Sequence, residues 1–191
     1  MKLVVLTAPS GAGKTTIARR LLKEIPGMRF SVSATTREAR PNERDGVDYH
    51  FLDQSAFNRM VANGDFVEHE EVYPGLYYGT LKSELELATA SEPILLDIDV
   101  RGARNVKGVY GPDARVIFIE PPSISVLEAR LRRRADSDHS LQERIDRAHD
   151  EMAFKNLFDN HVVNDDLELA VAETIERVRE FLSAPSANRL D

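Results

Sequence analysis

The sequence contains no cysteine in its 191 residues. This absence excludes a disulfide framework, a thiolate metal site such as a zinc ribbon, and a catalytic thiol, and it suits a reducing compartment. Positive charge is also in short supply, since 25 Lys and Arg stand against 32 Asp and Glu, for a formal net charge of -7. Proteins that bind nucleic acid generally neutralise its phosphates with a net basic surface. Nucleic acid is therefore not an expected partner, and any anion site must be local.

Long hydrophobic runs are missing as well. The N-terminus has one lysine and then about four apolar residues, fewer than a signal-peptide core needs. No stretch approaches the roughly 20 apolar residues that span a bilayer, and the chain has no internal repeat or low-complexity tract. We therefore expect a cytoplasmic protein with no membrane partner. A hydrophobic content of 42% is sufficient for one compact core.

Apolar runs of strand length alternate with helix-like patterns along most of the chain. The apolar runs are residues 2–8, 92–99, 114–121 and 160–166. The helix-like segments that follow them are residues 15–25, 101–110, 122–134 and 167–182. Continuous apolar runs are typical of strands that are buried on both faces. We therefore expect an α/β fold with a parallel sheet core covered by helices on both faces, with a small mixed α/β insertion and a helical lid.

Two segments interrupt this alternation. Residues 33–82 are polar and rich in tyrosine and turns, with short strand candidates and one amphipathic helix in 53–64, which favours a small mixed insertion. Residues 126–150 gather arginines around the apolar-poor stretch ADSDHS, which suits a mobile lid. The expected organisation is one compact unit. Its parts are core at 1–32, the mixed insertion at 33–82, core at 83–125, lid at 126–150, and core with a C-terminal helix at 151–191.

The segment APSGAGKTT lies between a buried strand and the start of a helix. Gly11 and Gly13 let the backbone curl so that successive N–H groups converge, and the helix dipole adds positive potential there. Lys14 offers a cation to the terminal phosphates of a nucleoside triphosphate, and Thr15 offers a hydroxyl to Mg²⁺. A turn that only joined strand to helix would need neither residue. The predicted ATP-binding loop is Ala8, Pro9, Ser10, Gly11, Ala12, Gly13, Lys14, Thr15 and Thr16, with Ala8 where the motif usually opens with glycine.

Nucleotide switches, motor ATPases and small-molecule kinases all use such a loop, so other motifs must identify the acceptor. These motifs are SATTREARPNERDGVDYHF (33–51), YYGT (77–80), LLDIDVRGAR (95–104), IEPPS (119–123) and VNDD (163–166). Their order and spacing resemble guanylate kinase over nearly the whole chain, to about residue 170. The resemblance implies an enzyme that transfers the γ-phosphoryl group of ATP to GMP, and to dGMP, giving ADP and GDP. It also implies a Mg²⁺ cofactor and in-line transfer under a closing lid.

The same resemblance makes 1–32 the core with the phosphate loop and 33–82 the GMP-binding insertion, and it assigns roles on the acceptor side. Two arginines and two tyrosines match the clamp on the GMP phosphate, where forked guanidiniums and phenol hydroxyls suit a dianion. Glu68 and Asp99 match the residues that accept hydrogen bonds from the guanine N1–H and amine. Strand ends such as that of Asp99 are where open α/β sheets bind ligands. The expected GMP-binding residues are Ser33, Arg37, Arg40, Tyr49, Glu68, Tyr78, Gly79, Thr80, Asp97 and Asp99.

On the donor side, lid arginines match residues that close on the triphosphate, and Asn164 matches a residue that contacts adenine. Asp97 and Asp99 are two residues apart in a strand and so point to the same face, and Asp97 resembles a carboxylate near the metal. The expected catalytic residues are Lys14, Arg37, Arg130, Arg134 and Arg144, and the expected metal-binding residues are Thr15 and Asp97. Because the acceptor is already a phosphate oxygen, no general base is required.

Two alternatives stay open at this point. One is a kinase of another small phosphorylated acceptor on the same scaffold, against which the pair of Glu68 and Asp99 argues. The other is a non-catalytic guanylate-kinase-like domain that binds phosphorylated peptides, against which an intact Gly13-Lys14-Thr15 argues. Asn42 and Arg101 depart from the family pattern without removing a matched contact, and the 70–76 loop is a variant whose effect on closure the sequence does not tell. The chain is expected to be a monomer or a homodimer.

Overall fold

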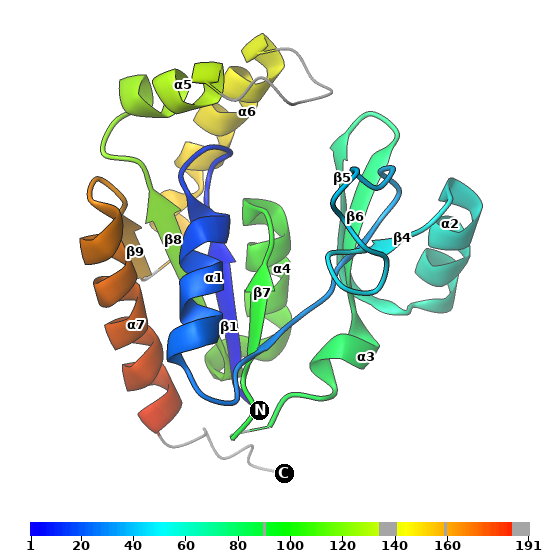
Figure 1. The fold of residues 1–191 in the computed structure, drawn as a ribbon. Helices are drawn as coiled ribbons and strands as arrows, with labels where there is room; N and C mark the ends of the chain where they lie inside the picture. The colour runs from blue at the N-terminus through cyan, green and yellow to red at the C-terminus, as the bar shows by residue number, and fades with distance from the viewer. Residues whose placement is uncertain (90, 134–140, 159, 185–191) are drawn as a thin grey trace.

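The computed structural model describes residues 1–89, 91–133, 141–158 and 160–184 (Figure 1). A five-stranded sheet, in the order β2-β7-β1-β8-β9, forms its centre, and every pair of neighbouring strands is parallel. The strands are β1 (Leu3–Thr7), β2 (Arg29–Phe30), β7 (Ile94–Asp97), β8 (Ala114–Glu120) and β9 (Asn160–Val163). The expected parallel core is confirmed. In the order of the strands, β1 is central, so the loop that follows it emerges in the middle of the sheet edge.

Helices cover both faces of this sheet, as expected (Figure 1). Side chains of a strand alternate between faces, and β1 shows the result in its buried residues. Val4 and Leu6 join a cluster with Ile17 of α1 and Val178 of α7, whereas Leu3 and Val5 join a cluster on the face of α4. The helices are α1 (Lys14–Glu24), α4 (Val100–Tyr110) and α7 (Leu167–Ser183).

A second, mixed sheet lies beside the core, in the order β4-β3-β6-β5. Its strands are β3 (Ala34–Thr35), β4 (His50–Phe51), β5 (Phe66–Tyr73) and β6 (Leu76–Leu81). The helix α2 (Gln54–Asn63) packs on it, begins at an Asp53 cap, and buries Phe57 against Phe66 with ring centroids 4.6 Å apart. The short helix α3 (Lys82–Leu85) leads back to the core. The polar segment 33–82 therefore folds around a small apolar cluster of its own.

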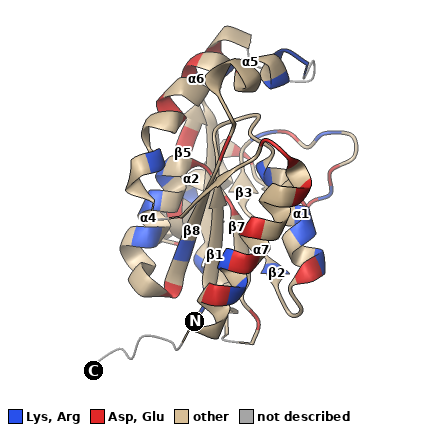
Figure 2. Ribbon diagram, turned by 90° about the vertical axis from the view of Figure 1, so that its left-hand side faces the viewer, with Lys and Arg blue, Asp and Glu red and all other residues tan. Residues whose placement is uncertain are grey.

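The remaining helices lie beyond the carboxyl end of β8 (Figure 1). They are α5 (Ile124–Arg133) and α6 (Leu141–Ala153). Two 3₁₀ turns complete the structure, η1 (Gly111–Asp113) directly before β8 and η2 (Lys155–Leu157) after α6. The expected site residue Arg134 lies outside the described residues. Both acidic and basic residues lie along α7 in Figure 2, in keeping with the mixed charge of the chain. In the described part of the chain, no helix has both the length and the apolar character that crossing a membrane requires.

Candidate active site

The loop between β1 and α1 has the geometry of a phosphate cradle. Gly11 and Gly13 have φ angles of 90° and 96°, in the left-handed region that favours glycine. A methyl group on Gly11 would also lie 2.9 Å from the Leu131 Cδ2 atom, so the Leu131 side chain would have to shift. Gly13 is the N-cap of α1, and the N–H groups of Lys14 and Thr15 at the start of the helix have no carbonyl four residues earlier within it. These N–H groups and the positive end of the helix dipole attract an anion.

The two expected metal-binding residues lie next to each other. Asp97 ends β7, which is paired with β1, and its Oδ2 atom accepts a hydrogen bond of 3.2 Å from the Thr15 hydroxyl. The Lys14 ammonium lies 2.5 Å from Asp97 Oδ1 and also donates to the Ile98 carbonyl at 2.8 Å. Lys14 is therefore already oriented at the mouth of the loop by a carboxylate from the neighbouring strand.

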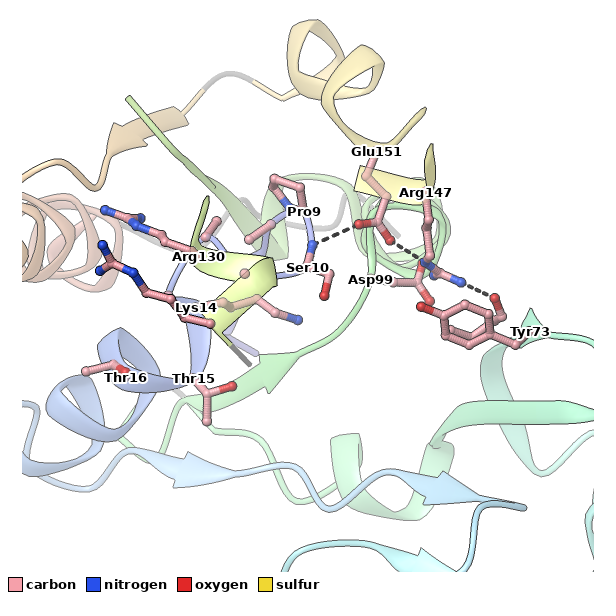
Figure 3. Close-up of a pocket in the computed structure, with 16 residues that line it drawn as sticks. Pro9, Ser10, Lys14, Thr15, Thr16, Tyr73, Asp99, Arg130, Arg147 and Glu151 are labelled. Carbon is pink, nitrogen blue, oxygen red and sulfur yellow. Dashed lines mark hydrogen bonds and ion pairs between the residues drawn. The ribbon is translucent and has the colours of Figure 1, made fainter. Parts of the chain in front are cut away.

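A cleft of about 510 Å³ opens around this loop (Figure 3). All of the expected loop residues from Ala8 to Thr16 line it. The lining residues from other segments are Val72, Tyr73, Asp99, Arg130, Arg133, Arg147 and Glu151. The cleft thus joins the phosphate loop to α5 and α6 on one side and to the end of β5 on the other.

The expected donor-side residues outside the loop take different positions. Arg130 lines the cleft and donates to the Asn164 backbone carbonyl at 2.9 Å. The Asn164 side chain is 5% exposed and donates through Nδ2 to the Ala12 carbonyl at 2.7 Å, so it supports the loop from behind. Arg144 is buried in α6 and, among the described residues, is not part of the cleft lining, in which Arg133 and Arg147 take part instead. The adenine contact of Asn164 and the lid role of Arg144 stay predictions.

A second cavity, of about 190 Å³, lies between the core and the mixed sheet and shares Lys14, Val72 and Asp99 with the cleft. It brings together expected acceptor residues from five separate places in the chain. Its lining is Lys14, Ser33, Tyr49, Glu68, Val72, Tyr78, Gly79, Asp97, Ile98 and Asp99. The expected residues Arg37, Arg40 and Thr80 are not in this lining, although Thr80 touches it through Glu68.

Glu68 of β5 is the buried carboxylate of this cavity, with 8% of its surface exposed. Thr80 donates to its Oε1 atom at 2.5 Å. Burial raises the pKa of Glu68 to about 7, with the negative charge of Asp99 adding to the shift and the Thr80 hydrogen bond opposing it. The carboxylate packs against α4, where a methyl group on Gly102 would lie 2.7 Å from Oε2. Glycine at 102 therefore leaves the room that this carboxylate occupies.

Asp99 has a local reason for its position. It is the N-cap of α4, and its Oδ1 atom accepts from the N–H groups of Arg101 at 2.7 Å and Gly102 at 3.0 Å. Aspartate is favoured at this position because it satisfies N–H groups that the helix leaves unpaired. The cap fixes the orientation of the carboxylate at the cavity wall, close to Glu68.

Arg37 is held at the edge of the cavity by a carboxylate that sequence reasoning missed. Its guanidinium lies 2.9 Å from Glu43 Oε1 and 5.4 Å from the centre of the Tyr49 ring. Although burial opposes the charge, hydrogen bonds with Glu43 and Tyr78 raise the pKa of Arg37, so it stays cationic. Glu43 also accepts from the Arg40 backbone N–H at 2.9 Å, while the Arg40 side chain is exposed. Glu43 lies in the NER stretch of the first motif, but a lone glutamate there looks like a solvated charge.

The tyrosines of the expected clamp lie together. The rings of Tyr49 and Tyr78 meet edge to face with centroids 5.8 Å apart. Burial raises the pKa of Tyr49, and the neighbouring negative charge of Asp97 acts in the same direction. Its phenol therefore stays protonated and is available as a hydrogen-bond donor to an anion.

Comparison with known proteins agrees with this arrangement. The family model described as guanylate kinase matches residues 1–184. The chain belongs to the guanylate kinase family. It is 56% identical over 183 residues to a guanylate kinase of Salinibacter ruber, covering 95% of this chain and 97% of that protein. A guanylate kinase of Porphyromonas gingivalis is 43% identical over 185 residues, covering 95% and 98%.

The fold comparison gives the same answer. The crystal structure of guanylate kinase from Anaplasma phagocytophilum superposes with a TM-score of 0.79 at 30% identity, covering 96% of this chain and 87% of that chain. The resemblance seen in the sequence motifs, the α/β fold and the assignment as an enzyme are thereby confirmed. Membership of the guanylate kinase family also favours the kinase reading over the non-catalytic alternative.

Proposed function

We propose that this protein transfers the γ-phosphoryl group of ATP to GMP, giving ADP and GDP, and that it also accepts dGMP. The observation that carries the proposal is a cavity walled by Glu68 and Asp99 that shares Lys14 with the phosphate loop. A donor phosphate on the loop and an acceptor phosphate in the cavity would then meet at Lys14. Membership of the family over residues 1–184 supports the same reaction.

The residues of the loop hold the donor. Backbone N–H groups around Gly11 and Gly13 cradle the phosphates, and Lys14 neutralises charge on the terminal phosphate once it leaves Asp97. Arg130 reaches the same cleft from α5, and we assign Arg134 and Arg144 to the closing lid. Transfer between two polyanions needs positioning and charge neutralisation more than covalent chemistry, because charge spreads over the transferring group.

Mg²⁺ fits the donor set beside the loop. Thr15 Oγ1 and Asp97 Oδ2 are hard oxygen atoms 3.2 Å apart. In the described residues no group of three or more His, Cys, Asp or Glu side chains could hold a metal by itself. Mg²⁺ is usually bound through one or two protein oxygens together with substrate phosphates and water, as this pair allows. When bound, the ion would draw charge from the phosphate oxygens.

The acceptor side explains a preference for guanine. Glu68 and Asp99 offer acceptors to the N1–H and exocyclic amine of guanine, whereas adenine has a bare acceptor at N1. Arg37, Tyr49 and Tyr78 supply charge and hydroxyl donors for the acceptor phosphate. A site that leaves buried polar groups unpaired can discriminate by about 10⁴. AMP should therefore be a very poor substrate, and IMP, which keeps N1–H but lacks the amine, should fall between AMP and GMP.

Closure of the mixed-sheet segment 33–82 and of the lid over both nucleotides would exclude water and prevent hydrolysis of ATP. We keep the division into core, insertion and lid as part of this proposal. The absence of cysteine fits a reducing compartment, so we expect the cytoplasm.

The test is ADP release measured with GMP, dGMP, IMP and AMP as acceptors. Equal turnover of GMP and AMP would overturn the assignment of the acceptor. Lys14→Ala should abolish transfer, because the ammonium acts on the transferring phosphate, while calorimetry should still detect GMP bound through Arg37, Glu68 and Asp99, more weakly because Lys14 also lines the cavity. Turnover of this variant near the wild-type rate would remove Lys14 from the chemistry.

A further inference from the structure

Arg147 of α6 joins two parts of the molecule that must move relative to each other if the enzyme closes. Its Nε atom donates to Glu151 Oε1 at 2.7 Å, and its Nη1 atom contacts the Val72 carbonyl (Figure 3). The guanidinium also lies over the Tyr73 ring, 5.1 Å from its centre. One side chain thus connects α6 to the end of β5 by a hydrogen bond and a cation–π contact.

Glu151 continues the connection to the phosphate loop. Its Oε2 atom accepts a hydrogen bond of 3.0 Å from the backbone N–H of Ser10, 141 positions earlier in the chain. The carboxylate is 6% exposed. A buried carboxylate needs partners for its charge, and here the partners are Arg147 and the loop itself. Burial raises the pKa of Glu151, and Arg147 and the Ser10 N–H oppose that rise.

The other end of the connection lies on the strand that carries the expected guanine acceptor. Val72 and Tyr73 are the last residues of β5, four and five positions after Glu68. The pairing of β5 with β6 shifts register between Glu71 and Tyr73, which frees the end of β5 to turn toward α6. A displacement of this end would move Glu68 together with Tyr78 and Gly79 on the paired strand.

We infer that Arg147 is a positioning residue that, through Glu151, couples the phosphate loop to the β5–β6 hairpin and so sets where the acceptor lies relative to the donor. The expected change in KM for GMP rests on the proposed function, whereas the expected change in the position of the hairpin does not. It assigns no chemical step to Arg147, whose atoms in this structure are committed to Glu151, Val72 and Tyr73. The donor and acceptor phosphates must be placed with a precision better than about 1 Å. A looser hairpin should therefore weaken productive GMP binding.

The first measurement is steady-state kinetics of Arg147→Met, which keeps most of the apolar stem and removes the charge and donors. We expect the KM for GMP to rise roughly tenfold, the scale of one hydrogen bond to a charged group, while the KM for ATP changes less than about twofold. Arg147→Lys keeps a cation over Tyr73 and should recover part of the loss. The matched control is Arg177→Met, since Arg177 forms the same type of pair with Glu173 on α7, at 2.5 Å.

The second measurement needs no catalysis. Because the chain has no cysteine, spin labels can be attached at two exposed alanines by Ala62→Cys on α2 and Ala172→Cys on α7. Pulsed electron spin resonance then gives the distribution of distances between the insertion and the core in the free protein. We expect Arg147→Met to broaden this distribution and Arg177→Met to leave it unchanged.

An unchanged distribution in Arg147→Met would overturn the inference, whatever the kinetics show. A KM for ATP that rises as much as the KM for GMP would also overturn it, because Arg147 would then contact the donor phosphates. If the wild-type protein failed to phosphorylate GMP, the proposed function would fall while the distance measurement still decided the link. Arg147→Lys serves in both measurements if Arg147→Met folds poorly.

Discussion

Replacing Glu68 with glutamine should stabilise the free protein above neutral pH and weaken GMP binding at the same time. The carboxyl group is 8% exposed, and burial raises its pKa from 4.5 to about 7. The ionised form is therefore unfavourable in the free fold, although it is the form that accepts hydrogen bonds from guanine. Glutamine keeps the shape and the acceptor for Thr80 but never ionises.

The sign and size follow from proton linkage. Between pH 4.5 and about 7, the folded protein keeps the proton on Glu68 while the unfolded chain has released it, so stability falls as pH rises through this window. Above about 7 both states have released the proton and the cost is constant. The pKa of Glu68 is about 2.5 higher in the folded protein than in the unfolded chain, which corresponds to about 3 kcal/mol of stability. The glutamine variant lacks this loss.

The assay is urea unfolding of the wild type and Glu68→Gln between pH 5 and pH 8, with Glu176→Gln on the exposed face of α7 as the control. Glu68→Gln should exceed the wild type by about 3 kcal/mol at pH 8, and the difference should shrink toward pH 5. Calorimetry at pH 8 should show GMP bound about tenfold more weakly, or worse, because one charged acceptor is lost.

Two results would refute this reasoning. Equal stability of the two proteins at every pH would show that Glu68 is not held in an unfavourable ionised state. Unchanged GMP affinity in Glu68→Gln would remove Glu68 from the acceptor site. A further check is the GMP affinity as a function of pH. Below pH 7 this affinity should fall more steeply in the wild type than in Glu68→Gln. Titration of the GMP phosphate, near pH 6, affects both proteins alike.

Most of the core could be predicted from the sequence, because the core strands are continuous apolar runs. The runs at 2–8, 92–99 and 114–121 became β1, β7 and β8, and the helix expected in 53–64 became α2. The two-residue strands β2 and β3 could not be read in this way, since two residues define no period. Their places are set by pairing with β7 and β6, which is information about contacts distant in the chain.

The site likewise has a part that the sequence predicts and a part that it does not. The phosphate loop is one continuous stretch of sequence, so its residues and their spacing were enough to predict a phosphate cradle. The acceptor cavity depends on segments distant in the chain, and only the family resemblance placed Ser33, Glu68 and Asp99 in one list before the cavity united them. The bond between Ser10 and Glu151 spans 141 positions and has no local pattern at all. Partly buried partners such as Glu43 escape sequence reasoning because their contacts depend on the tertiary fold.

Two further substitutions test how the fold supports the site. The Lys2 ammonium is buried and donates to the carbonyls of Phe181 and Ala184 at the end of α7, both at 3.0 Å. Lys2→Met should therefore cost about 1.5 to 3 kcal/mol in urea unfolding, with exposed Lys23→Met as the control and turnover unchanged. Gly102→Ala would place a methyl group 2.7 Å from Glu68 Oε2, while Gly108, in the same helix, has open space. The carboxylate must then move away from α4, so Gly102→Ala should lower GMP affinity about tenfold, the scale of one hydrogen bond to a charged group. Binding of an ATP analogue should be unchanged, because the phosphate loop lies outside this contact. Gly108→Ala is the control, because it adds the same methyl group to the same helix away from Glu68. Equal GMP affinities of Gly102→Ala and Gly108→Ala would show that GMP binding does not depend on the position of Glu68 against α4.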